Sequence, residues 1–529
     1  MRRTTIQLRQ AAIVLAAVAT VGLAVVPSTR SEETGGLQPL NEQEWNEAKA
    51  RHLLFRAGFG NTPEEMARLH ALDPRRAVDL LVDFHKQPEP KFALAIESPR
   101  PRKLIIDRAA LAKLKPEDRK KRLQELRKQQ GDSRRNEREQ FVDLREWWIR
   151  RMVESPRQLE EKLVLFWHGH FATGYRTVQS SYAMYTQNEL FRKHAAGNFG
   201  QMLKGIVHDP AMLRHLDNDK NVKQHPNENL AREIMELFSL GEGNYTEQDI
   251  KGAARALTGY GFDRRSFEFV FRANAHDEDE KTIFGRTGNW DGDDLVDLIL
   301  EQPATARFIA RKLFVFFAHE DPSQQTVEQL AAVLRENDYE LAPMLKTLFL
   351  SQEFFAPAAM GTQIKSPVQL VVGALRSLNI KEANCTALLA ATQEMGQELL
   401  QPPNVKGWDG GRAWINTNTL FSRHNFAAPL VTPATKPAGQ GIPAAADVDL
   451  AKLLEDKGLQ SAADIVDYLT EACLVTTISD SRRQLLIELL EGDQPLPAPS
   501  EWKDQRQMVN ARLVALLVAI MGMPEYQLT

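Results

Sequence analysis

Two histidines that flank a single glycine, His168 and His170, are the first residues whose types and spacing could do chemistry. Imidazole nitrogens are common ligands of transition metals. In a regular helix, residues two positions apart point about 200° away from each other and cannot share one ion. Gly169 is a suitable helix end, however, and would leave His170 outside the last turn. The segment predicts either two ligands of one divalent metal ion or two rings that form local hydrogen bonds among aromatic neighbours.

A second polar segment, residues 227–241, has apolar residues at helical spacing. Asn227 is a suitable cap for this helix and Gly241 a suitable terminator. The expected packing face consists of Leu230, Ile234, Leu237, Phe238 and Gly241.

Two carboxylates of this helix, Glu233 and Glu236, lie with Asn229 on one flank of that face. There, desolvation could raise a pKa or a cation could be held. The alternative is a set of ordinary surface acids with one ion pair between Glu228 and Arg232. The candidate residues are therefore His168, His170 and Glu233 as metal ligands, and Glu233, Glu236 and Arg232 as catalytic residues.

Acidic residues also cluster at 275–281, which includes Asp277, and at 289–294. They suggest calcium, but the closing glutamate of an EF-hand loop is absent. The simpler interpretation is that Asp293 or Asp294 caps the following helix.

A glycine-rich loop at 402–414 carries two tryptophans, Trp408 and Trp414. Exposed indole rings on such a loop can stack on a sugar face. The alternative is that both rings fill the core while the glycines make the turns.

Helical spacing dominates the elements that must position these residues. We expect a mostly α fold, a large multi-helix domain with a small β-hairpin near 262–285. There Phe267, Phe269 and Phe271 alternate with Glu268, Val270 and Arg272. The expected organisation is a core domain at 37–430, a Pro- and Ala-rich linker at 431–446 and a helical segment at 447–529 that packs on the core. Residues 514–523 should form a buried helix of that last segment.

Residues 97–140 form a basic helical insertion, with 15 Lys and Arg against 8 Asp and Glu. A polyanion or a membrane surface is one possible partner. A solvated helical excursion is the alternative, which the thin apolar stripe favours.

The first 26 residues have the order of an export signal. Three arginines and no acid precede an apolar run at 11–26, which Pro27 ends. This run is short of the roughly 20 residues of a comfortable spanning helix. The protein is therefore expected in the periplasm or outside the cell, with residues 11–26 as a membrane anchor if they stay uncleaved.

Charge and cysteine content exclude several classes of function. The 529 residues carry 66 basic and 70 acidic side chains, a formal net charge of −4. Nothing in this balance indicates nucleic acid. Two cysteines exclude a disulfide scaffold and a cysteine-based zinc cluster.

Several motifs, taken in order, resemble the bacterial domain of unknown function 1800 family. The resemblance covers roughly residues 45–430 and rests on residues 52–60, 166–171, 209–212, 227–241, 254–260, 365–367 and 402–408. It implies an exported, largely helical protein, often encoded beside a second exported protein that resembles sulfatases and phosphatases. It supplies no catalytic mechanism. Gly169 stands where members often have Asn, so an Asn side chain is not essential there.

Two classes of function remain open. One is a non-catalytic assembly or binding partner of another exported protein, which we favour because no nucleophile–base pair is legible. The other is a metal-assisted hydrolase of an envelope or extracellular polymer, with His168 and His170 as ligands and Glu233 or Glu236 as a further ligand or general base.

Overall fold

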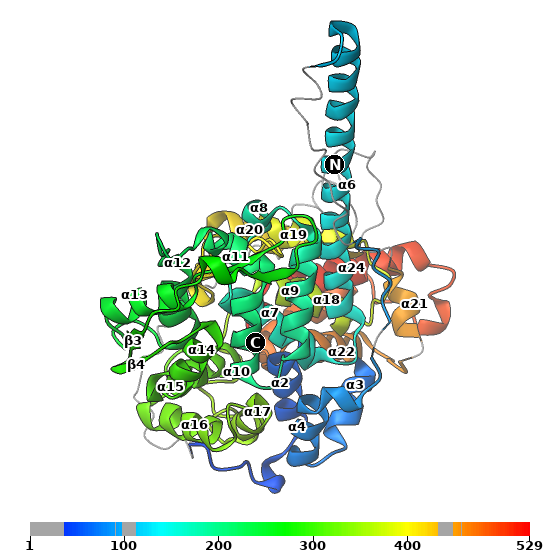
Figure 1. The fold of residues 1–529 in the computed structure, drawn as a ribbon. Coiled ribbons are helices and arrows are strands. Elements are labelled where there is room, and N and C mark those ends of the chain that lie inside the picture. The colour runs from blue at the N-terminus through cyan, green and yellow to red at the C-terminus, as the bar shows by residue number, and fades with distance from the viewer. Residues whose placement is uncertain (1–35, 90, 98–112, 432–447, 456) are drawn as a thin grey trace.

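The fold is described from a computed structural model, which covers residues 36–89, 91–97, 113–431, 448–455 and 457–529. These residues are mostly helical, with two small antiparallel hairpins, which confirms the predicted fold class. Figure 1 shows α7 near the centre, α6 projecting from one side, and α13–α16 opposite α21 and α22. The predicted export signal lies outside the described residues, as does almost all of the predicted linker.

Helix α7 (Gln158–His170) is the central element, and every residue in it except Gly169 is buried. It packs against α2 (Glu47–Ala57), α4 (Pro74–Val82), α6 (Pro116–Glu154) and α9 (Ser181–Lys193). Because α7 also contains charged residues, its burial requires partners for them. Glu161 has two, Arg151 at 2.7 Å and Arg192 at 3.0 Å.

Local sequence signals explain where many helices begin. Thr62 and Glu65 form a capping box at the start of α3 (Pro63–His70). The cap of α14 (Gly292–Leu300) was predicted wrongly, because Asp291 fills that position. Its carboxylate accepts from the backbone N–H groups of Asp293 and Asp294, at 2.9 and 3.0 Å.

Helix α6 is long, and its first half projects from the body of the molecule (Figure 1). Its buried apolar residues lie almost entirely in the second half, from Phe141 to Val153, where the helix packs on α18 (Pro367–Ser377) and α19 (Cys385–Glu394). The basic insertion thus includes the projecting half, while residues 98–112 lie outside the description. None of the described helices combines the length and apolar character needed to cross a membrane.

Two hairpins occupy the region in which one was predicted. Strand β1 (Tyr260–Phe262) pairs with β2 (Phe269–Phe271), and β3 (Lys281–Ile283) pairs with β4 (Arg286–Gly288). Phe267 belongs to the first turn, with φ of +54°, and not to a strand.

The remaining helices complete one continuous apolar core, which extends from Leu40 to Tyr526. In the middle of the chain they are α8 (Tyr175–Val178), α10 (Phe199–His208), α11 (Pro210–His215), α12 (Asn229–Glu233), α13 (Glu247–Ala256), α15 (Pro303–Phe317), α16 (Gln324–Glu336) and α17 (Leu341–Leu350). Toward the C-terminus they are α20 (Thr417–Val431), α21 (Leu450–Glu455), α22 (Ala462–Cys473), α23 (Asp480–Glu491) and α24 (Arg506–Gly522). Helix α24 packs on α20 and contains the helix predicted at 514–523 except for its last residue, Met523, which is the C-cap.

Candidate binding cleft

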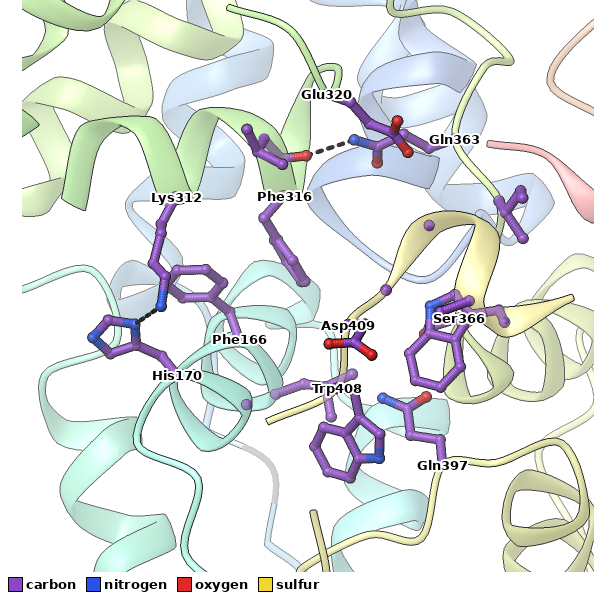
Figure 2. A pocket seen from close by; sticks show the side chains of 18 of the residues that line it. Phe166, His170, Lys312, Phe316, Glu320, Gln363, Ser366, Gln397, Trp408 and Asp409 are labelled. Atoms are coloured by element: carbon purple, nitrogen blue, oxygen red, sulfur yellow. Dashed lines mark hydrogen bonds between the residues drawn. The ribbon is translucent and has the colours of Figure 1, made fainter. Parts of the chain in front are cut away.

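A cleft of about 820 Å³ lies between α7, α15 and the 402–414 loop. Figure 2 shows His170 and Phe166 on one side, Trp408 and Gln397 on the other, and Phe316 reaching from α15 toward Asp409. Its volume is in the range of small-ligand sites, which combine aromatic walls with a few placed polar groups.

Two helical stripes form the base of this cleft. Phe166 and His170 lie four residues apart on α7, and Phe308, Lys312 and Phe316 recur every four residues on α15. The stripes meet where the Phe166 and Phe316 rings lie 5.0 Å apart and the His170 and Phe308 rings 6.2 Å apart.

His170 of α7 forms a hydrogen bond to the helix predicted at 227–241. That helix continues from α12 as a π-helix, η4 (Ile234–Ser239), and Gly241 ends it with φ of +80°. The last carbonyls of any helix lack partners within it. Here His170 Nε2 donates to the Phe238 carbonyl at 3.0 Å, and Lys312 Nζ donates to the Leu237 carbonyl at 3.2 Å.

Lys312 and His170 also bond to each other, Nζ to Nδ1 at 3.2 Å (Figure 2). Burial and the neighbouring Lys312 charge hold the pKa of His170 well below its usual value. The ring is therefore neutral and accepts at Nδ1 while it donates at Nε2. Burial also lowers the pKa of Lys312 to about 8.

His168 has different neighbours because α7 continues through His170, so the predicted helix end at Gly169 is wrong. Its ring lies 5.4 Å from that of Trp148 and 5.7 Å from that of Trp408. Burial lowers its pKa to about 3, and Nε2 has no hydrogen-bond partner in the described part of the chain.

A close contact between two glycines holds the 402–414 loop, called the tryptophan loop below, against α7. A Cβ on Gly407 would lie 2.1 Å from the Gly169 carbonyl oxygen, and Gly407 has φ of +84°. Trp408 follows it, half-buried at the cleft wall, while Trp414 is buried and also lines the cleft. The two rings therefore fill space in the fold and border the cleft together.

The predicted catalytic residues lie beside the cleft and not in its lining. Arg232 forms a bidentate ion pair with Glu247, at 2.8 and 2.9 Å, and the predicted pair with Glu228 at 3.1 Å. Glu236 accepts a hydrogen bond from Tyr245 at 2.7 Å. Burial and the Glu236 charge raise the pKa of Glu233, and Lys406 of the cleft opposes that effect.

No group of three or more His, Cys, Asp or Glu side chains within the described ranges could hold one metal ion. Each predicted residue has its own neighbours, and Asp277 pairs with Arg255 at 2.6 Å. A metal on His170 would have to displace one of its two hydrogen bonds. The metal hypothesis stays a prediction.

Several lining residues were missed by reasoning from the sequence, above all Lys312 and Lys406. The available signal for Lys312 was a lysine inside the apolar stripe of its helix. Two glutamines in the walls are held by backbone groups: Gln363 Nε2 donates to the Val315 carbonyl at 2.6 Å, and Gln397 Oε1 accepts from Val368 N at 3.0 Å. No local sequence pattern marks either glutamine.

Comparison with protein families matches residues 52–528 to the family described as protein of unknown function (DUF1800). The chain belongs to this family, and the match extends past residue 430, where the motif resemblance ended. Comparison with curated proteins and with solved structures finds no match.

Proposed function

We propose that this chain is an exported, non-catalytic binding protein whose cleft holds a short stretch of saccharide. The observation that carries the proposal is the convergence of Trp408 and Trp414 with three glutamines, Gln363, Gln369 and Gln397, around one cleft. Indole faces stack on the C–H faces of a sugar ring. Each glutamine uses one end of its amide for a backbone hydrogen bond, and the other end, Oε1 of Gln363 and Nε2 of Gln369 and Gln397, can bond to a sugar hydroxyl. A cleft of about 820 Å³ accommodates a ligand of a few sugar rings.

The family resemblance suggests how such a protein would act. A second exported protein that resembles sulfatases and phosphatases would act on the saccharide that this chain holds. Co-purification of the two from the native host tests this partnership independently of the cleft.

Binding is tested by titrating the purified full-length protein with a panel of neutral and acidic oligosaccharides. We expect at least one to bind with a Kd below about 1 mM, and Trp408→Ala to weaken it at least tenfold. Trp290→Ala is the matched control, because Trp290 is a half-buried indole just after β4 that does not line the cleft.

Failure of the whole panel to bind, or unchanged affinity in Trp408→Ala, would refute the proposal. The same incubations test the hydrolase alternative. New reducing ends in the wild-type reaction would replace a binding role with an enzymatic one.

A further inference from the structure

The cleft is lined by more cations than anions. Four basic side chains line it, Arg311, Lys312, Lys406 and Arg412, against the acids Glu320 and Asp409. Within the described part of the chain, none of the four forms an ion pair with a carboxylate within 4 Å. The charge of Lys406 nevertheless acts on Glu233, whose pKa it lowers. The lining therefore offers basic groups to a ligand.

Two further cationic side chains lie behind the base of the cleft. The Phe316 ring lines the cleft, and Lys162 Nζ lies 5.6 Å from its centroid. Lys162 donates to the Gly58 carbonyl at 2.9 Å, and its fully buried neighbour Arg56 donates to the Ala359 carbonyl. Arg56 Nε and Nη1 are buried and have no partner among the described residues.

A second buried pair lies behind another wall. Ile364 and Ser366 line the cleft, whereas Lys365 between them is buried, with its Nζ 4.2 Å from the centre of the Tyr526 ring. Arg423 donates to the Lys365 carbonyl at 2.9 Å. Neither of these two side chains has a carboxylate within ion-pair distance in the ranges the structure describes.

Buried cations without counterions cost free energy, because a low-dielectric interior disfavours the charged form. Consistent with that cost, burial lowers the pKa of Lys365 to about 7, and burial together with Arg56 lowers that of Lys162. An anion in the cleft would supply the missing negative charge to both the lining and the interior.

On the basis of the function proposed above, we infer that the saccharide held in this cleft is acidic, with a carboxylate or a sulfate ester group placed against Lys312 and Lys406. Trp408 then stacks on the sugar ring, and Asp409 and Glu320 accept hydrogen bonds from its hydroxyls. Because an anion stabilises the protonated form of Lys312, whose pKa burial lowers to about 8, binding takes up a proton.

The test compares two ligands that differ only in charge, a galacturonate tetrasaccharide and its fully methyl-esterified form. Isothermal titration of the full-length protein at pH 8, in buffers of different ionisation enthalpy, measures affinity and proton uptake together. A sulfated tetrasaccharide without uronic acid, such as one from carrageenan, distinguishes ester sulfate from carboxylate, and inorganic phosphate distinguishes an acidic sugar from a free anion.

We expect an acidic tetrasaccharide to bind at least tenfold more tightly than the methyl ester and to take up protons, which the ester does not. Lys406→Gln and Arg412→Gln, both on the exposed loop, should each reduce the affinity for the acidic form at least threefold. Lys204→Gln is the control, because Lys204 pairs with Asp297 on the surface and does not line the cleft.

The outcomes separate the two proposals. Equal affinity for the acid and the ester overturns this inference and leaves saccharide binding intact. Phosphate binding as tight as that of the acidic sugar overturns the saccharide as occupant. A preference for the acid without proton uptake overturns the contact of the anion with Lys312, and no binding of any probe overturns both proposals.

Discussion

Replacing Gly407 with alanine tests whether the contact between the tryptophan loop and α7 builds the cleft. The new Cβ would lie 2.1 Å from the Gly169 carbonyl oxygen, where ordinary contacts begin near 3.4 Å. The backbone fixes the position of the Cβ, and the oxygen is itself a backbone atom, so no side-chain rotation can relieve the clash. The loop must move by about 1 Å, which separates Trp408 from α7.

The expected cost has two parts. An alanine at φ of +84° costs about 1–2 kcal/mol, partly offset by the smaller entropy of the unfolded chain. The clash adds about 1–3 kcal/mol. Gly243→Ala isolates the first part, because Gly243 has φ of +83° and nothing within 4 Å of its Cβ position.

Urea unfolding followed by far-ultraviolet circular dichroism measures both variants. We expect Gly407→Ala to lose at least about 1 kcal/mol more than Gly243→Ala, and also to lose saccharide affinity while Gly243→Ala keeps it. Equal losses of stability in the two variants would refute the reasoning, since they would show that the loop does not depend on its contact with Gly169.

Four further predictions concern protons, metal and export. The affinity for the acidic saccharide should fall as pH rises through about 8, where Lys312 loses its charge, while His170 stays neutral; a pH-independent affinity in titrations from pH 6 to 10 would count against Lys312. Burial raises the pKa of Asp209 to about 7, so the native state binds the extra proton between roughly pH 4 and 7 and loses stability as pH rises through that window. Asp209→Asn should therefore gain about 1–4 kcal/mol on the wild type between pH 5 and pH 8 in urea unfolding, and a constant difference between the two proteins would contradict this. The metal hypothesis predicts one divalent ion per chain, by elemental analysis, that His168→Ala with His170→Ala removes; metal that survives the double substitution would disprove the ligand assignment. Deleting residues 1–26 should leave a folded helical protein in the cytoplasm, whereas an unfolded, insoluble product would argue against an export signal.

The sequence by itself determined the local structure. Helical spacing and caps specified most elements because both depend on residues within about one turn of each other. For this reason the sequence shows the Thr62–Glu65 capping box, the Glu228–Arg232 ion pair and the helix terminator Gly241. Two predicted caps were wrong. The observed cap of α14, Asp291, precedes the predicted Asp293 or Asp294 in a run of acids where several could serve. Helix α12 begins after Glu228, one residue past the predicted cap Asn227.

The cleft was decided by contacts between distant parts of the chain. His170 was correctly singled out as a polar residue that meets the 227–241 helix, but it meets a backbone carbonyl there and not a carboxylate. Its other partner, Lys312, is 142 residues away, and no local pattern encodes that pairing. Whether a lysine stays solvated or is buried without a counterion depends on which helices close over it. The positive character of the cleft, invisible in a chain of net charge −4, therefore exists only in the tertiary structure.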